Sequence, residues 1–335
     1  MLNVAVVGLG WWGRTIASLL KGNPKLCLVK CVDVSPAAGK FAAEQGIAFT
    51  KDFTAAVNDP GVQAVILCTP HSQHCEQIVR AAKAKKHVFC EKPLSLNRAD
   101  VLKAVSACNA NGVALAVGHE KRFEPPVVEL FRMAAAGELG TLLQAEGNFS
   151  LDKFLAMPAD NWRLTEKEAP AGPMTATGIH LLDLSVGLLG PAANVCARVR
   201  QLGSNLVNGD TLGLLVSHQS GSNSLISAIL ATPFDGRFAV YGSKGWAEVR
   251  DKAHPESPEG WTLTYELRGK KRQSKDYLPA KAVLANLEAF ADAAAGRAPY
   301  PVPQEQMIAN ISALEAVFKS ARSGNIEPVD NGDTQ

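Results

Sequence analysis

Residues 3–13 read Asn-Val-Ala-Val-Val-Gly-Leu-Gly-Trp-Trp-Gly, an apolar strand that runs directly into a Gly-x-Gly-x-x-Gly turn. Gly8 permits the tight turn after the strand, Gly10 lets the backbone approach a pyrophosphate, and Gly13 lets the following helix pack closely on the sheet. The free N–H groups at the start of that helix attract phosphate charge. The stretch therefore predicts a dinucleotide site on a doubly wound parallel sheet, with a purely structural glycine turn as the alternative.

An acidic residue supports the dinucleotide interpretation. Asp33 lies 20 residues after Gly13, at the end of a second apolar run. A carboxylate at this place accepts hydrogen bonds from ribose hydroxyls. We therefore expect NAD as the cofactor, with NADP as the alternative.

The first 120 residues alternate between strand and helix patterns. Such alternation predicts right-handed βαβ units and a parallel sheet that is covered on both faces. The expected strands are 4–7, 26–32, 64–68, 87–90 and 113–117, and the expected helices are 12–21, 36–45, 53–57, 73–84 and 97–111.

The pattern changes after Gly118. Mixed polar and apolar runs separated by Gly, Asn, Ser or Pro predict an α+β region built on a mostly antiparallel open sheet. We expect α/β architecture overall, with a Rossmann domain over 1–121, a substrate-binding and oligomerisation domain over 122–328, and a polar tail over 329–335. The expected strands here are 142–150, 195–202, 212–218, 224–232, 237–241, 247–250 and 263–266, and the helices are 129–136, 178–189, 282–295 and 304–323.

Composition narrows the class of partner. The chain has 335 residues, a net charge of +2 and 47% hydrophobic residues, so we expect neither nucleic acid nor a membrane as partner. Seven cysteines form no Cys-x-x-Cys pair, which favours a reducing compartment. No uninterrupted apolar run reaches about 18 residues, and we expect a cytoplasmic protein.

Lys92 lies in Glu91-Lys92-Pro93, just beyond an expected strand. Ligands of open α/β sheets bind outside the carboxyl ends of the strands. A lysine there, when partly desolvated, can act as a proton donor or acceptor. The alternative is a solvated surface lysine.

These motifs together resemble a known family. Glu91-Lys92-Pro93 behind a Rossmann half is similar to the signature of the glucose–fructose oxidoreductase / inositol dehydrogenase (Gfo/Idh/MocA) family. Thr69-Pro70 with His74, Trp162-Arg163, Gly178-Ile-His-Leu-Leu-Asp183 and the helix around 315–321 match further family segments in order. The resemblance spans nearly the whole chain.

The resemblance implies an NAD(P)-dependent oxidoreductase. Such an enzyme transfers a hydride between the nicotinamide and a secondary alcohol or ketone of a sugar, inositol or related polyol. It also implies Lys92 close to the reacting oxygen, His180 as proton acceptor or relay, and a homodimer or homotetramer that pairs through the C-terminal sheet. Two other functions stay open: a dehydrogenase of a cyclic dihydrodiol, and a non-catalytic dinucleotide-binding regulatory protein.

One departure from the family concerns the proton-transfer residues. Family members commonly carry an aspartate four residues before the histidine, where this chain has Ala176. Asp183 is the expected substitute that orients the imidazole of His180, with a salt bridge as the alternative. Arg122 is the expected ligand for a substrate oxygen or carboxylate, with an ion pair as the alternative.

The predicted site residues fall into three groups, and no metal ligands are expected. His71, His74 and Cys75 fit a strand-to-helix loop better than a metal site. The catalytic group is Lys92, His180 and Asp183; the cofactor group is Gly8, Gly10, Trp11, Trp12, Gly13, Asp33, Thr69, Pro70, His74, Glu91 and Lys92; the substrate group is Lys92, Arg122, Arg163, Thr177 and His180.

Overall fold

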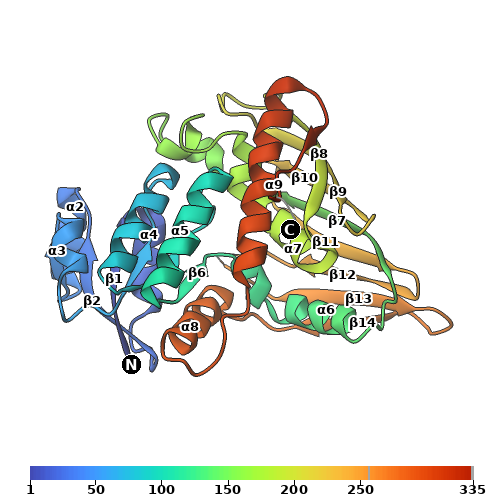
Figure 1. Ribbon diagram of the computed structural model, residues 1–335. Coiled ribbons are helices and arrows are strands. Elements are labelled where there is room, and N and C mark those ends of the chain that lie inside the picture. The colour runs from blue at the N-terminus through green and yellow to red at the C-terminus, as the bar shows by residue number, and fades with distance from the viewer. Residues whose placement is uncertain (256, 333–335) are drawn as a thin grey trace. The chain divides into compact units, whose positions relative to one another are not determined.

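The computed structural model describes residues 1–255 and 257–332 (Figure 1), and the chain divides into two compact units. The first unit combines 1–119 with 283–307, and the second combines 120–282 with the residues from 308 onward. The predicted boundary at residues 121 and 122 lies two residues from the first transition. The return of 283–307 to the first unit differs from the prediction, which placed them in the second domain.

The first unit contains a six-stranded sheet in the order β3-β2-β1-β4-β5-β6, and every neighbouring pair is parallel. The predicted doubly wound parallel sheet is confirmed. The strand order reverses between β1 and β4, which is the switch point where ligands bind in such folds. The strands are β1 (Leu2–Val7), β2 (Leu26–Val32), β3 (Ala48–Thr50), β4 (Ala64–Leu67), β5 (His87–Cys90) and β6 (Leu115–Val117).

Six helices belong to the first unit. Asn97 caps α5 by accepting a hydrogen bond from the backbone N–H of Asp100, so the helix begins one residue after the predicted start. The helices are α1 (Trp11–Leu19), α2 (Pro36–Glu44), α3 (Phe53–Val57), α4 (His74–Lys83), α5 (Arg98–Asn111) and α8 (Ala282–Ala294).

Helix α8 completes the core of the first unit although it comes late in the chain. Its Phe290 packs edge-on against Phe89 of β5, with ring centroids 5.8 Å apart, and both rings are almost fully buried. The amide of Asn286 donates to the carbonyl oxygen of Val117 at the end of β6, and the hydroxyl of Tyr300 donates to the same oxygen. Apolar packing and these hydrogen bonds therefore hold the segment to the parallel sheet.

The second unit is built on a nine-stranded sheet in the order β14-β13-β12-β11-β7-β10-β9-β8-β15. All its described strand pairs are antiparallel except β7 with β10, so the predicted mostly antiparallel sheet is confirmed. The strands are β7 (Leu142–Ser150), β8 (Ala192–Arg200), β9 (Thr211–His218), β10 (Asn223–Ile229), β11 (Asp235–Gly242), β12 (Gly245–Asp251), β13 (Trp261–Leu267), β14 (Gln273–Tyr277) and β15 (Glu327–Pro328).

Helix α7 (Ile179–Leu189) packs on one face of this sheet, against β7 and β10 (Figure 1). Gly147 in β7 makes room for it, because a Cβ at that position would lie 3.1 Å from both methyl groups of Leu181. The opposite face is more open, and Leu215 and Leu225 stand as partners on neighbouring strands there, each more than two-fifths exposed. Pairing of two copies through this face stays a prediction.

The remaining helices are α6 (Pro125–Ala135), which contacts β12 and β13, and α9 (Gln304–Ser323). Among residues 1–255 and 257–332, no helix is both long and apolar enough to cross a membrane. No three His, Cys, Asp or Glu side chains of these residues gather where they could hold a metal ion.

Candidate functional site

The glycine turn between β1 and α1 has the geometry that its sequence predicts. Gly8 has a φ of +87°, and a Cβ there would lie 2.7 Å from the carbonyl oxygen of Cys68, beyond β4. A Cβ on Gly13 would overlap the carbonyl oxygen of Gly8, so the helix reaches its position only with glycine there. A Cβ on Gly10 would meet nothing within 4 Å. Two of the glycines are therefore needed for packing, while the third borders open space.

The helix that follows this turn starts without a side-chain cap. Gly10 is the N-cap residue of α1, and it has no side chain that could cap the N–H groups of the first turn. The N-terminal N–H groups of a helix attract anions. The open space at Gly10 and the uncapped helix start together fit a pyrophosphate.

Asp33 lies at the end of β2 and supports the glycine turn directly. Its carboxylate accepts the backbone N–H of Leu9 at 2.5 Å and that of Ser35 at 2.7 Å. A carboxylate has about four lone-pair directions, so acceptor capacity remains for ribose hydroxyls. Asp33 thus positions the turn, and its contact with a ribose stays a prediction.

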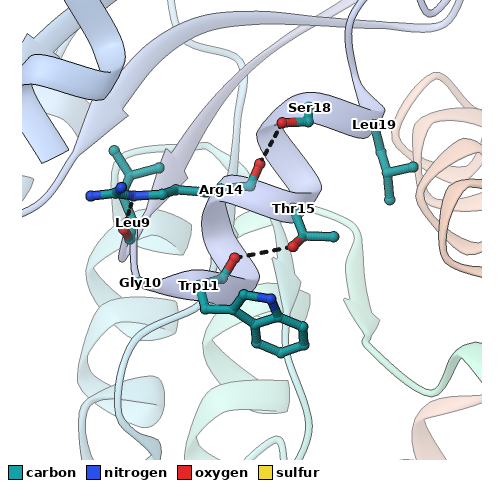
Figure 2. Close-up of a pocket in the computed structure, with 7 residues that line it drawn as sticks. All are labelled: Leu9, Gly10, Trp11, Arg14, Thr15, Ser18 and Leu19. Atoms are coloured by element: carbon teal, nitrogen blue, oxygen red, sulfur yellow. Dashed lines mark hydrogen bonds between the residues drawn. The ribbon is translucent and has the colours of Figure 1, made fainter. Parts of the chain in front are cut away.

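The two tryptophans of the turn have different surroundings. Trp11 is 47% exposed and borders a surface pocket along α1 together with Leu9, Gly10 and Arg14 (Figure 2). Arg14 turns back and donates from Nε to the carbonyl oxygen of Leu9. Trp12 packs against the hydrophobic core of the first unit, which favours the packing interpretation over a cofactor contact for its ring.

His74 joins two loops at the same edge of the parallel sheet. One ring nitrogen lies 2.8 Å from the carbonyl oxygen of Pro93, after β5, and the other lies 3.0 Å from that of Thr69, after β4. The ring is completely buried, and Thr69 donates its hydroxyl to Gln77. His74 therefore holds these two loops together, and its predicted role in cofactor binding stays a prediction.

Lys92 follows β5 at this edge, beside a tightly packed acid. The neighbouring Glu91 is 8% exposed, and its carboxylate fills the space left by the missing side chain of Gly118 after β6. Its Oε2 accepts the backbone N–H of Lys92 at 3.3 Å. The Lys92–Pro93 peptide bond is cis. The predicted cofactor residues of the first unit thus lie at the carboxyl ends of β1, β2, β4 and β5, where a dinucleotide would be held.

The second unit contains a buried ion pair between two predicted site residues. Nε of Arg122 donates to Oδ2 of Asp183 at 2.6 Å, and Nη2 donates to Oδ1 and to the backbone carbonyl of the same residue. Gly187, one turn further along α7, leaves room for the guanidinium, which also lies over the ring of Phe131. The structure shows the ion-pair alternative for both residues, because Arg122 and Asp183 pair with each other.

A second buried charge cluster was not predicted from the sequence. Nζ of Lys121 lies 3.1 Å from Oδ1 of Asp251 and 3.2 Å from Oε1 of Glu124, and all three side chains are nearly inaccessible. Burial raises the pKa of Glu124 to about 8. Burial opposes the charge on Lys121, but Asp251 and Glu124 together raise the pKa of its ammonium above the usual value. The sequence shows alternating charges at Glu120, Lys121 and Arg122, followed by Glu124. This local pattern does not indicate the distant residues with which these side chains pair.

His180 lies in the first turn of α7 and is 3% exposed. Its Nδ1 is 3.6 Å from Oε2 of Glu120, and its ring lies 5.8 Å from that of Phe149 in β7. Asp183 has both carboxylate oxygens bonded to Arg122. Glu120, which was not among the predicted site residues, is therefore the carboxylate seen at this ring nitrogen.

The segment before α7 is a π-helical turn over Met174–Gly178, a feature often found at functional sites. Thr177 donates its hydroxyl to the carbonyl oxygen of Pro173, and Ala176 retains partial exposure. Arg163 stacks its guanidinium 4.1 Å from the ring centre of Trp162. Substrate contacts of Thr177 and Arg163 stay predictions.

Comparison with family models matches both halves of the chain. Residues 2–119 match the oxidoreductase family with an NAD-binding Rossmann fold, and residues 127–248 match the GFO/IDH/MocA C-terminal domain. The two matched regions fall within the first and second units.

Relatives and solved structures agree with these matches. The chain is 31% identical to the scyllo-inositol 2-dehydrogenase (NAD(+)) of Bacillus subtilis (strain 168) over 72% of this chain and 71% of that protein. It is 30% identical to the myo-inositol 2-dehydrogenase of Thermotoga maritima over 73% and 74%. The structure of an aldose-aldose oxidoreductase from Caulobacter crescentus complexed with glycerol has the same fold, with a TM-score of 0.85, 23% identity, and 98% and 99% coverage. This chain therefore belongs to the GFO/IDH/MocA family of NAD(P)-dependent oxidoreductases.

Proposed function

We propose that this protein oxidises or reduces a CH–OH group of a sugar, an inositol or a related polyol. The observation that carries the proposal is the identity of 30% or more to two inositol dehydrogenases over more than 70% of the chain. Lys92 and His180, the residues that family resemblance assigns to the reaction, are both present. Asp33 supports NAD over NADP, because its carboxylate can accept hydrogen bonds from ribose hydroxyls, one of which a 2′-phosphate would replace.

The residues of the chain divide the chemistry between them. Gly10 and the start of α1 bind the pyrophosphate, and Asp33 binds ribose hydroxyls. A bound nicotinamide cofactor would supply the acceptor for the hydride of the carbinol carbon. Lys92 stabilises negative charge on the substrate oxygen. His180 accepts the hydroxyl proton, since its ordinary pKa lies near neutrality.

The test is turnover by the full-length protein. We expect NADH formation, followed by absorbance, with NAD and at least one member of a panel of inositols, sugars and polyols, and weaker turnover with NADP. A panel of cyclic dihydrodiols run alongside decides the alternative substrate class. Tight cofactor binding without turnover on any panel would show instead a non-catalytic dinucleotide-binding protein.

The role of Lys92 is tested in the same assay. We expect Lys92→Ala to lower turnover by at least about 100-fold, the scale of losing a positioned proton-transfer group. Lys103→Ala, on the exposed side of α5, is the matched control and should leave the rate unchanged. A near-normal rate in Lys92→Ala would refute the assignment.

A further inference from the structure

The inference concerns the acid that acts on His180, which the family commonly carries at the position of Ala176. Alanine has no polar atom, so residue 176 gives the imidazole no carboxylate. The side chain of Glu120 is 15% exposed and that of His180 is 4% exposed, and their Oε2 and Nδ1 are 3.6 Å apart. Charges this poorly exposed interact more strongly than charges in water. The carboxylate at His180 therefore comes from the turn Glu120–Phe123 and not from the segment that precedes α7.

The other charged groups on the elements that pack against α7 have partners of their own. Lys121 is paired with Asp251, and Arg122 with Asp183. Glu146 of β7 lies with Asn148 on the open face of the sheet. Phe149, which contacts His180, lies on the opposite face. The π-helical turn and β10 contain no charged residue. Glu120 is thus the carboxylate for which the structure shows His180 as an ion-pair partner.

We propose that Glu120 is the positioning residue for His180 in this chain and takes over the role of the acid that is missing at Ala176. The inference rests on the proposed function, in which His180 accepts a proton. A carboxylate on the Nδ1 side keeps the proton on Nδ1, leaves the Nε2 lone pair available, and stabilises the imidazolium once Nε2 has taken the substrate proton.

The geometry suits this role without a rearrangement of the fold. At 3.6 Å the two atoms are within ion-pair distance but beyond a hydrogen bond, and catalytic hydrogen bonds are often long before substrate binds. The proton balance is simple: the hydroxyl proton moves to Nε2, Nδ1 keeps its own, and the carboxylate of Glu120 balances the resulting charge. Glu120 itself gains and loses no proton.

The first experiment measures the histidine directly and needs no substrate. Ring nitrogen signals of the full-length protein are recorded by NMR against pH, with His180 assigned by His180→Asn. In Glu120→Gln we expect the His180 titration to move to lower pH and the population with the proton on Nδ1 to fall. Glu266→Gln, a carboxylate of the exposed β13 pair with Arg272, is the matched control and should change neither. An unchanged His180 titration in Glu120→Gln overturns the proposal.

The second experiment uses the enzyme reaction. We expect Glu120→Gln to lower kcat by about 10-fold, with the KM for NAD unchanged, and to move the acidic limb of kcat/KM to lower pH. Ala176→Asp added to Glu120→Gln should recover most of the lost rate, because it returns an acid to the family position. If Glu120 has only a structural role, the added Ala176→Asp should not restore the rate. A double variant as slow as Glu120→Gln alone therefore counts against the proposal.

The two experiments separate this inference from the proposed function. If the wild-type protein turns over no polyol, the proposed function fails while the NMR titration still decides the Glu120 contact. If turnover occurs and the His180 titration does not respond to Glu120→Gln, the inference alone fails. Should Glu120→Gln fold poorly by circular dichroism, Glu120→Asp carries the same comparison, with a smaller shift expected in the same direction.

Discussion

The glycine turn of the first unit and the α7 region of the second unit are built in different ways. At the turn, the backbone makes the site: Gly8 and Gly13 are needed because neighbouring main-chain atoms occupy the space of a side chain. Around α7, side chains make the site, through the Arg122–Asp183 pair and the Glu120–His180 contact. A backbone-built site can be recognised from one short stretch, whereas a side-chain-built site depends on partners about 60 residues apart.

The largest expected effect, on stability and NAD binding together, tests the backbone-built region. Gly13→Ala puts a Cβ onto the carbonyl oxygen of Gly8, so α1 must shift. We expect a loss of stability of about 3 kcal/mol and at least about 100-fold weaker NAD binding, measured by urea unfolding and calorimetry.

Gly10→Ala is the matched substitution in the same turn. Its Cβ has open space, so we expect stability to change by less than about 0.5 kcal/mol. NAD affinity should still fall about 10-fold, which is about 1.4 kcal/mol, because the methyl group occupies the approach of the pyrophosphate. Unchanged affinity would show that the pyrophosphate lies elsewhere.

The next effect tests the side-chain-built region. Arg122→Met leaves the buried carboxylate of Asp183 without its guanidinium, and breaking such a pair costs about 3–5 kcal/mol. We expect a correspondingly lower urea midpoint, and partial recovery when Asp183→Leu is added. Lys319→Met, which breaks an exposed pair with Glu315, should cost less than about 0.5 kcal/mol. A normal midpoint with a raised substrate KM in Arg122→Met would instead support the predicted substrate contact.

The smallest expected effect, counted as the change in stability per pH unit, comes from a buried acid. The pKa of Glu124 is raised from 4.5 to about 8, so between these values the folded protein binds more protons than the unfolded chain. Stability therefore falls as pH rises through this window, by up to about 1.4 kcal/mol per pH unit.

Glu124→Gln removes this titration. We expect the variant to match the wild-type protein near pH 5 and to exceed its stability above pH 8, measured by urea unfolding at each pH. Asp251→Asn, which removes the other carboxylate from Lys121, should be less stable at every pH. An identical pH dependence in Glu124→Gln and wild type would show that Glu124 does not hold the proton.

Local patterns explain which parts of the fold could be predicted. The glycine turn, the capped α5 and the apolar strands follow rules that act within a few residues. Strand β3 has three residues, and β14 is polar and mostly exposed, so neither has an apolar pattern. The pairing of Arg122 with Asp183 left one trace, Gly187 four residues after the aspartate. Nothing near His180 in sequence pointed to Glu120, since the two residues lie 60 positions apart and meet only in the folded chain.

The late position of α8 has a consequence for synthesis on the ribosome. Residues 283–307 complete the first unit, and Phe290 covers Phe89 in its interior. The parallel sheet is fully translated by His119. The segment 283–307, which completes this unit, is fully translated only 188 residues later, at Met307. At about 5–20 residues per second, this leaves roughly 10–40 s during which the nascent sheet exposes apolar surface. The strands of the first unit are thus synthesised early, but the unit is completed late. In the interval, its exposed apolar surface is the kind of surface that chaperones bind.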